Sequence, residues 1–338
     1  MKKVKCLLLS PFLLAIILVI TAFTWWRINS QPLSVSSEKV TFVITKGSSV
    51  SQIGNKLKER EIIKSALAFK LYLQVSGNSK KIQAGEYELS ADKSLSEIVK
   101  EFLNGPSQLW VTIPEGLRRE EIALRYAEVL GKKDNEYTLF VDEFLNLSSS
   151  KEGFLFPDTY LVPKDVSAQK VINLMINTFD SKIATLKSLV SDSSYSLDKI
   201  ITVASLVERE TKTDEERPLV AGVIYNRLDI GMGLQIDATL QYALASSKMA
   251  LSSRKLNEIK FWETLTSEDK KMDSLYNTYK YNGLPPTPIC SPGLSSIKAA
   301  LEPEESDYLY YLHDLQGQVH FAMTLEEHNA NIRKYLND

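Results

Sequence analysis

The pattern of hydrophobic and polar positions begins with a long apolar run. After Met1–Lys5, residues 6–26 carry no charged side chain, and most of them are Leu, Ile, Val, Phe or Ala. About twenty apolar residues at a helical rise of about 1.5 Å span a bilayer core of about 30 Å, so residues 6–26 are predicted to form a transmembrane helix. Residues 1–5 are then a short tail, and residues 27–39, which include a Ser-rich stretch, a linker.

Charged and aromatic residues flank this run. Trp25 and Trp26 lie where an aromatic belt would, three lysines precede the run, and Arg27 follows it. The positive-inside bias predicts a cytoplasmic N-terminus, with the rest of the chain outside the cytoplasm. A cleaved signal peptide is the alternative, but the run exceeds a usual h-region and no A-x-A cleavage site follows it. The sequence therefore predicts a single-pass protein of the cell (inner) membrane.

Residues 40–105 alternate between strand-like and helix-like segments. Val40–Ile44 is rich in β-branched and aromatic residues, which favours a strand, and residues 85–89 return as a second strand. Helical spacing or boundary residues predict helices near 50–57, 65–75 and 94–103. This stretch is predicted to be a small α+β unit that ends at Gly105-Pro106.

The remainder is predicted as a connecting α/β segment, residues 106–150, and a larger mixed α/β domain, residues 151–338. The boundary is placed at the polar loop that ends at Glu152. The expected strands cover 109–113, 308–312 and 319–322, and an extended stretch covers 234–240. Helices are expected over 119–130, 140–147, 168–189, 200–211 and 295–301. Two further helices are expected to begin at Thr213 or Asp214 and near Thr324. The predicted fold class is α+β.

The segment Ile200–Thr211 carries the main candidate chemistry. At about 100° per residue its apolar side chains form one broad arc with polar residues opposite, which predicts an amphipathic helix. Glu208 and Glu210 lie near its end, beside apolar neighbours. A carboxyl group held against apolar side chains loses solvation, and its pKa rises toward the range of a general acid. Surface glutamates at a helix end are the alternative, and helical geometry alone does not separate Glu208 from Glu210.

Composition narrows the function. The chain has 338 residues and a net charge of -2, which argues against a nucleic-acid binder. The three histidines lack a metal-ligand spacing, and no CxxC or HExxH motif occurs, so neither a metal nor a cofactor is expected. Cys6 and Cys290 would lie on opposite sides of the anchor, so no disulfide is expected between them.

Polar residues also follow the acid-bearing helix. Alternation within Leu234–Leu240 places Gln235, Asp237 and Thr239 on one side of an extended stretch. A polar strand face is often simply solvated. Because this stretch directly follows the acid-bearing helices, the competing hypothesis is that its polar side chains contact a substrate.

Two resemblances extend this interpretation. Gly47-Ser-Ser-Val-xx-Ile-xxx-Leu57, after a strand, resembles the first half of a LysM module, which binds N-acetylglucosamine-containing glycans, although a generic βα unit has the same pattern. From about residue 38 to the end, and most clearly from Gly153, the chain resembles the endolytic murein transglycosylases, the YceG-like family. The motifs that carry this resemblance are Ala204-Ser-Leu-Val-Glu-Arg-Glu210, Val223-Ile-Tyr-Asn-Arg-Leu228, Gly231-Met-Gly-Leu-Gln-Ile-Asp237, Tyr276-Asn-Thr-Tyr279, Gly283-Leu-Pro-Pro286, Ser291-Pro-Gly293 and His328-Asn329.

Two residues depart from the family pattern. Ala238 stands where a proline often follows the aspartate, and Thr287 replaces the glycine common after the double proline. Both changes alter the rigidity of a loop rather than its chemistry. They therefore bear on the geometry of substrate binding more than on activity.

The family resemblance implies a reaction and a set of site residues. The implied substrate is nascent peptidoglycan, cut at the β-1,4 bond between N-acetylmuramic acid and N-acetylglucosamine to leave a 1,6-anhydro ring. A glycosidase normally needs two carboxylates. Here the C6 hydroxyl of the sugar is the nucleophile, so one carboxyl group can act as acid and then as base. The family's catalytic acid, the second glutamate of Glu-x-Glu, corresponds to Glu210. The residues expected to contact glycan, from their positions in the matching motifs, are Gln235, Asp237, Tyr276, Asn277 and Thr278.

The expected function is that of a membrane-anchored lyase that cuts within nascent strands and limits their length. Its expected partners are peptidoglycan glycan strands, the cytoplasmic membrane, and peptidoglycan synthases of the elongation or division machinery. One alternative is a non-catalytic glycan-binding scaffold for these synthases. The other is a muramidase-type hydrolase, in which Glu208, Asp237 or another carboxylate would have to activate water.

Overall fold

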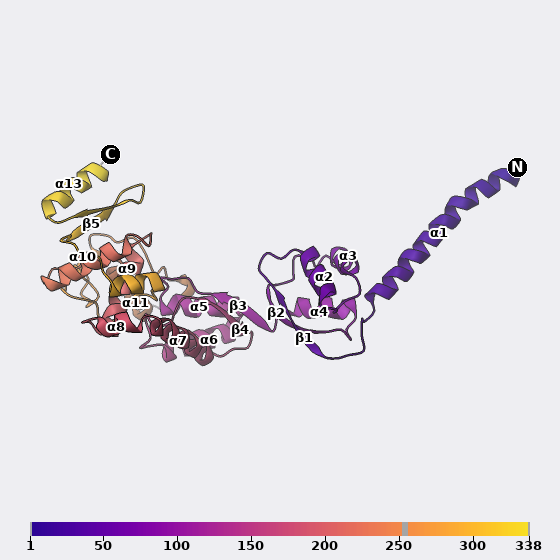
Figure 1. Cartoon of the computed structure of the whole chain (residues 1–338), viewed down its shortest axis with the longest axis horizontal. Coiled ribbons are helices and arrows are strands. Elements are labelled where there is room, and N and C mark those ends of the chain that lie inside the picture. The colour runs from indigo at the N-terminus through magenta and orange to yellow at the C-terminus, as the bar shows by residue number, and fades with distance from the viewer. Residues whose placement is uncertain (1, 252–255, 337–338) are drawn as a thin grey trace. The chain divides into compact units, whose positions relative to one another are not determined.

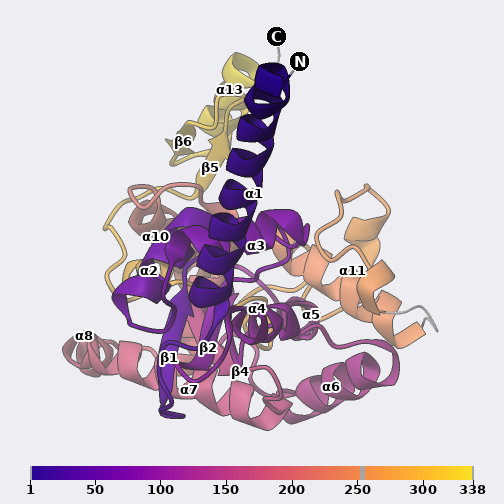
Figure 2. The same cartoon turned by 90° about the vertical axis from the view of Figure 1, so that its right-hand side faces the viewer.

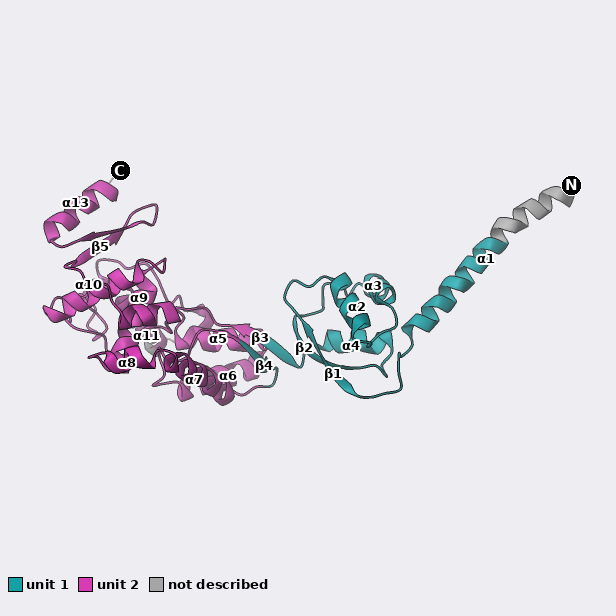
Figure 3. Ribbon diagram, in the orientation of Figure 1, with its two compact units in different colours: residues 1–110, 160–165 teal, residues 111–159, 166–338 magenta. Residues whose placement is uncertain are grey.

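The computed structural model describes residues 2–251 and 256–336, and for residues 2–12, 250 and 251 it describes the backbone alone. The chain is a mixed α+β protein, as the sequence predicts (Figure 1). It divides into two compact units (Figure 3). Unit 1 comprises residues 1–110 and 160–165, and unit 2 comprises residues 111–159 and 166–338.

The first element, α1 (Lys2–Ser30), contains the predicted membrane segment. Its Leu13–Ser30 part is long and apolar enough to cross a membrane, and none of it is buried in the protein. The hydroxyls of Thr21 and Thr24 donate to the carbonyls of Ile17 and Ile20, 2.9 Å and 2.8 Å away. These bonds satisfy polar groups that an apolar surrounding would otherwise leave unpaired.

The rest of unit 1 is built on an antiparallel pair of strands. In chain order the elements are β1 (Lys39–Ile44), α2 (Val50–Glu59), α3 (Ala66–Val75), β2 (Gly85–Ser90) and α4 (Leu95–Asn104). The strands pair from Lys39 opposite Ser90 to Ile44 opposite Gly85. Serines at positions 49, 65 and 94 cap α2, α3 and α4, as expected from their side chains. Buried aromatic residues on the strands and helices form the core: Phe42, Phe69, Tyr87 and Phe102.

The sheet has four strands in the order β1-β2-β3-β4. β3 (Gln108–Thr112) agrees with the predicted strand, whereas β4 (Thr159–Pro163) was not expected from the sequence. β4 is only five residues long, so its alternation is too short to stand out. The boundary predicted near residue 150 remains a prediction.

Unit 2 is mainly helical. Its helices are α5 (Arg119–Val129), α6 (Asp134–Leu147), α7 (Ala168–Ala184), α8 (Lys187–Asp192), α9 (Leu197–Glu210), α10 (Arg217–Asp229), α11 (Asp237–Leu251), α12 (Leu294–Leu301) and α13 (Leu325–Tyr335), with short 3-10 turns at Leu256–Glu258 and Asp269–Lys271. β5 (Tyr310–His313) and β6 (Val319–Ala322) form the predicted hairpin. Thr324 caps α13, as predicted.

Three local predictions in unit 2 were wrong. The helix expected over 168–189 is two helices, α7 and α8, and α10 begins at Arg217 rather than after a cap at Thr213 or Asp214. The extended stretch expected over 234–240 ends where α11 begins at Asp237. Alternating polarity over seven residues does not distinguish a strand from the first turn of a buried helix.

α9 is the central helix of unit 2. Every residue from Ile200 to Val207 is buried, and the helix packs against α10, α11 and α12. The predicted polar face is wrong, because Thr202 and Ser205 are buried as well. Their hydroxyls donate to backbone carbonyls one turn earlier in the helix, and Ser205 Oγ also accepts from the amide of Ile289, 3.1 Å away. These bonds allow a polar face to enter the core.

Candidate active site

Glu210 is the last residue of α9, where the buried helix emerges from the core. Protein atoms surround its carboxyl group, yet the residue keeps some accessible surface. Burial raises the pKa of Glu210 above 4.5, a hydrogen bond from Tyr311 lowers it, and the charge of Asp237 raises it again. Because burial is the largest of these effects, Glu210 is a carboxyl group biased toward its protonated form.

Tyr311 reaches Glu210 from β5. Its hydroxyl donates to Oε2 of Glu210 at 2.8 Å. His313 is two residues further along the same strand, and its Nε2 lies 2.9 Å from Oε2 of Glu216. The sequence did not single out Tyr311, since a hairpin of alternating tyrosines gives no sign of which helix it will meet.

Asp237 begins α11 close to this carboxyl group. The hydroxyl of Tyr279 donates to Oδ1 of Asp237 at 2.5 Å, and the ammonium of Lys270 lies 4.2 Å from the centroid of the Tyr279 ring. Burial and the bond to Asp237 raise the pKa of Tyr279, and the charge of Glu210 also contributes. Tyr279 ends one of the motifs quoted above, so the sequence contained a signal for it, although it was not among the predicted site residues.

The loop before α11 holds a strained backbone at Gln235. Its φ is +53°, a left-handed backbone conformation that residues other than glycine rarely adopt. Thr278 holds this loop in place: its carbonyl accepts from the amide of Gln235 at 3.1 Å, and its Oγ1 accepts from the amide of Ile236 at 2.9 Å. The side chains of Gln235 and Asp237 both remain exposed. Strain of this kind gathers at binding sites, which supports the prediction that the loop is functional.

Arg227 joins the two segments that flank Glu210. From α10, its Nε donates to the carbonyl of Leu309 at 2.6 Å, just before β5, and its Nη1 donates to the carbonyl of Leu234 at 2.5 Å. The side chain is buried, and burial lowers its pKa. Arg227 therefore fixes the positions of Tyr311 and of the Gln235 loop relative to one helix. Arg227 lies within the motif Val223–Leu228, so the sequence contained a signal for it, although it was not among the predicted site residues.

Glu208 has a different environment from Glu210. Its Oε2 accepts from the amide of Gly293 at 2.9 Å and from the hydroxyl of Ser296 at 2.7 Å, and Nη2 of Arg217 lies 3.5 Å from its Oε1. Only 8% of the side chain is exposed. These contacts tie the end of α9 to the start of α12, so both carboxylate oxygens of Glu208 have partners within the protein.

The remaining predicted contacts are distributed differently. The Tyr276 ring packs 4.9 Å from the ring of Tyr242, and its hydroxyl lies 2.7 Å from Oγ1 of Thr287, the residue that departs from the family pattern. Asn277 and Thr278 are 0% and 1% exposed. Asn277 donates to the carbonyls of Lys270 and Met272 and so closes the loop that carries Tyr279. The structure thus brings Asp237 to Glu210 and places Asn277 and Thr278 behind the surface.

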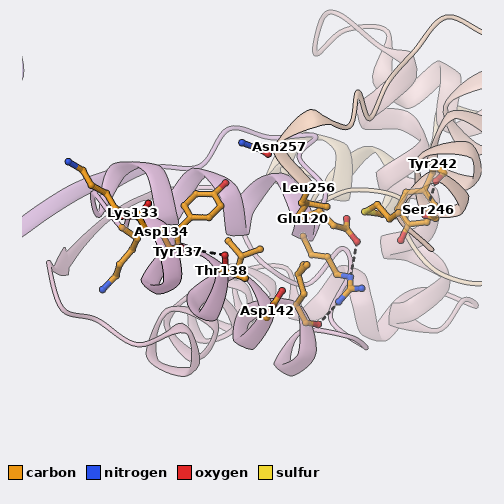
Figure 4. A pocket seen from close by; sticks show the side chains of 15 residues that line it. Glu120, Lys133, Asp134, Tyr137, Thr138, Asp142, Tyr242, Ser246, Leu256 and Asn257 are labelled. Carbon is orange, nitrogen blue, oxygen red and sulfur yellow. Dashed lines mark hydrogen bonds and ion pairs between the residues drawn. The ribbon is translucent and has the colours of Figure 1, made fainter. Parts of the chain in front are cut away.

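A cavity of about 930 Å³ lies elsewhere in unit 2, bordered by α5, α6 and α11 (Figure 4). Its wall includes Glu120, whose carboxylate is paired with Arg118 at 3.0 Å and Arg119 at 3.3 Å. Neither Glu210 nor any of the predicted glycan contacts lines it. Behind Tyr242, the buried carboxyl group of Glu152 accepts from that tyrosine's hydroxyl at 3.2 Å. Glu120 and Glu152 are therefore engaged in internal contacts.

Comparison with known proteins identifies the class to which this arrangement belongs. Residues 42–334 match the model of the YceG-like family, and the chain belongs to that family. An endolytic murein transglycosylase of Bacillus subtilis (strain 168) is 35% identical over 93% of this chain and 90% of its own length. One of Streptococcus pneumoniae serotype 2 (strain D39) is 29% identical over 90% of this chain and 60% of its own length.

A solved structure agrees with this grouping. The crystal structure of a yceG-like protein from Listeria monocytogenes is 35% identical, with a TM-score of 0.59, over 87% of this chain and 99% of that one. The prediction that the chain belongs with the lytic transglycosylases, which are lyases, is confirmed by these matches.

Proposed function

We propose that this chain is an endolytic murein lytic transglycosylase that cleaves the bond between N-acetylmuramic acid and N-acetylglucosamine in nascent strands and leaves a 1,6-anhydro end. The observation that carries the proposal is the environment of Glu210. It is a carboxyl group with a raised pKa at the accessible end of a buried helix, in a chain related to named murein transglycosylases. Cutting within nascent strands would limit their length.

The proposed reaction needs one carboxyl group. Protonated Glu210 gives its proton to the bridging oxygen as the bond from C1 of N-acetylmuramic acid to that oxygen breaks. The C6 hydroxyl of the same sugar forms the new bond to C1, and the Glu210 carboxylate takes the hydroxyl proton. The acid is regenerated and no water is consumed. A raised pKa suits the first half of this cycle, because the group must carry a proton at the start.

The contacts of the two glutamates favour Glu210 over Glu208 as the acid. Oε2 of Glu208 accepts from an amide and a hydroxyl and its Oε1 faces Arg217, so both oxygens are engaged within the protein. The carboxyl group of Glu210 accepts a hydrogen bond from Tyr311 at Oε2. Its Oε1 is then the atom that we assign to proton transfer.

We propose that Gln235, Asp237 and Tyr276 contact the glycan directly. Gln235 is exposed on a strained loop, and Asp237, whose charge acts on Glu210, is exposed at the start of α11 that follows it. Asn277 and Thr278 are buried, so we propose that they act on substrate binding by fixing the Tyr279 loop and the Gln235 loop. Tyr279 joins the site through its hydrogen bond to Asp237.

We further propose that α1 anchors the protein in the cytoplasmic membrane, with its N-terminus in the cytoplasm and unit 2 outside. The apolar Leu13–Ser30 part and the lysines before it support this orientation. Residues 40–105 are proposed to be a LysM-like glycan-binding unit. Synthases of nascent peptidoglycan are the proposed protein partners, because an enzyme that trims new strands works where they are made.

Mass spectrometry of muropeptides tests the proposal. The full chain in detergent is incubated with nascent-type glycan strands, beside Glu210→Gln and a matched control, Glu215→Gln, which alters an exposed glutamate nearby. Anhydro ends with the parent and Glu215→Gln, but not with Glu210→Gln, are expected. Reducing ends would indicate a hydrolase instead, and no cleavage by the parent would indicate a scaffold. Full activity of Glu210→Gln would contradict the assignment of the acid.

A further inference from the structure

Helix α3 in unit 1 exposes a continuous apolar stripe. Leu67, Leu71 and Val75 are 57%, 37% and 89% exposed, and their spacing of four places them on one side of the helix. The opposite side of α3 is buried in the core of unit 1 through Phe69 and Leu73. Single exposed apolar residues are normal, but a stripe along one helix indicates a surface that meets another apolar phase.

This stripe lies beside the end of the proposed membrane anchor. The ring of Tyr72 in α3 stacks on the ring of Trp26 in α1, with centroids 6.1 Å apart and planes 11° apart. Trp26 closes the apolar run, at the depth where tryptophan and tyrosine gather at a membrane surface. Figure 2 shows α3 lying across the axis of α1. A helix that crosses a transmembrane helix at this depth runs along the plane of the bilayer.

The charge around α3 suits a phospholipid surface. From Ile62 to Gly85 the chain carries four lysines, at positions 64, 70, 80 and 81, and no acidic residue, whereas the whole chain has a net charge of -2. Lys70 lies on α3 itself, exposed between Leu67 and Leu71. Helices that lie in a membrane interface combine an apolar face with lysine or arginine at its polar side, which bind anionic lipid headgroups.

We propose that α3 is a second membrane contact of this protein, an in-plane helix that inserts Leu67, Leu71 and Val75 into the outer leaflet beside α1 while Lys70 binds anionic phospholipid. The proposal rests on α1 being the membrane anchor. Its consequence is that unit 1 is held against the bilayer by two helices, so that unit 1 has a fixed face toward the membrane.

Spin labels on the full chain in nanodiscs test this inference. A nitroxide at Val75→Cys reports on α3, one at Glu88→Cys, an exposed position of strand β2, is the matched control, and one at Leu18→Cys reports on the anchor. Cys6 is replaced by Ser, and Cys290 is buried and expected not to react. In anionic nanodiscs, the ratio of collisions with oxygen to collisions with a water-soluble nickel complex is expected to be severalfold higher at position 75 than at position 88.

The outcomes separate the two proposals. A label at position 18 that is open to nickel would contradict the anchor itself. A lipid-embedded label at 18, together with labels at 75 and 88 that are equally open to nickel, would overturn the α3 contact alone. A label at 75 shielded from both reagents would also overturn it, because a protein would then cover the stripe. Lys70→Glu is expected to lower the ratio at 75 in anionic nanodiscs and to leave it nearly unchanged in zwitterionic ones, and an equal ratio in anionic lipid would contradict the lysine contact.

Discussion

The hydroxyl of Tyr311 donates a 2.8 Å hydrogen bond to Glu210 across 101 positions of the sequence. This bond favours the ionised carboxylate, while burial and the nearby charge of Asp237 favour the protonated acid. Interactions with His313 and Arg209 also favour the carboxylate, so the pKa of Glu210 is a balance between influences of both signs, of which burial is the largest. Since each neighbour contributes with a known sign, substitutions at Tyr311 and Asp237 should move this pKa in opposite directions.

Tyr311→Phe is predicted to move the alkaline limb of the pH profile of kcat/KM to higher pH. Loss of the donor removes an interaction that favours the charged form, so Glu210 keeps its proton to a higher pH. The rate at the optimum should fall as well, because the carboxyl group loses its positioning contact. The measurement is the release of anhydro-muropeptides across a pH series. A limb that stays in place or moves to lower pH would show that Tyr311 does not act on the acid.

Asp237→Asn is predicted to move the same limb to lower pH. Removing a negative charge near Glu210 makes its ionisation easier. The side chain of Asp237 is 56% exposed, so the shift should be small and should shrink as salt screens the charge. The profile is measured at low and high ionic strength. A shift in the same direction as that of Tyr311→Phe would contradict the opposing roles assigned to the two residues.

Glu208→Ala is predicted to destabilise the fold rather than only to alter chemistry. The substitution leaves the amide of Gly293 and the hydroxyl of Ser296 without their acceptor, at a cost on the order of 1–3 kcal/mol for each buried group. Thermal unfolding measures the loss, with Glu215→Ala as the exposed control. A Tm equal to that of the control would mean that these contacts contribute little, and Glu208 would return as a candidate acid.

The sequence predicted most elements whose pattern is local. The capped helices of unit 1, the β5–β6 hairpin and the acid-bearing helix α9 have periodicity or boundary residues that can be read in one stretch of chain. Helix α11, which begins at Asp237, was missed, since its first residues alternate in polarity like a strand. Burial of the polar face of α9 was missed too, because Thr202 and Ser205 satisfy their hydroxyls on the helix backbone.

Only part of the candidate site could be predicted, because a sequence pattern is local and some contacts of the site are not. Glu210 and Asp237 lie in motifs, and the family pattern points to them. Tyr311 acts on Glu210 and Arg227 on the carbonyl of Leu309, each through a partner far along the chain. No local pattern records such contacts. Conversely, the position of Asn277 and Thr278 in a motif did not reveal that their side chains are buried.

Gly222→Ala is predicted to lower the Tm, although alanine usually stabilises a helix interior by roughly 0.5–1 kcal/mol relative to glycine. A Cβ at position 222 in α10 would lie 2.4 Å from the backbone oxygen of Glu304. The backbone would have to move, and overpacking of this kind costs about 1–3 kcal/mol. Gly54→Ala in α2, where the nearest atom is 3.1 Å away, is the milder comparison. A higher Tm for Gly222→Ala than for the parent would contradict this close approach.

Glu152 is predicted to make stability depend on pH. Burial and the charge of Glu120 raise its pKa from 4.5 to about 8, against the opposing charge of Arg118. Between these values the folded chain binds a proton that the unfolded chain has released, so the free energy of unfolding falls as the pH rises through that window. Glu152→Gln carries no such proton and should remove this part of the decline.

Thermal unfolding between about pH 5 and 8 measures this effect as a difference between variants. Relative to the parent, Glu152→Gln should gain stability as the pH rises, since the amide does not ionise: its oxygen can accept from the backbone N–H of Arg119, and its NH2 group can donate to the hydroxyl oxygen of Tyr242. Glu128→Gln, an exposed change on α5, should show a constant difference from the parent. If the difference for Glu152→Gln were equally constant, the carboxyl group would have to be ionised in the folded state throughout, with the guanidinium of Arg118 outweighing the burial that surrounds it.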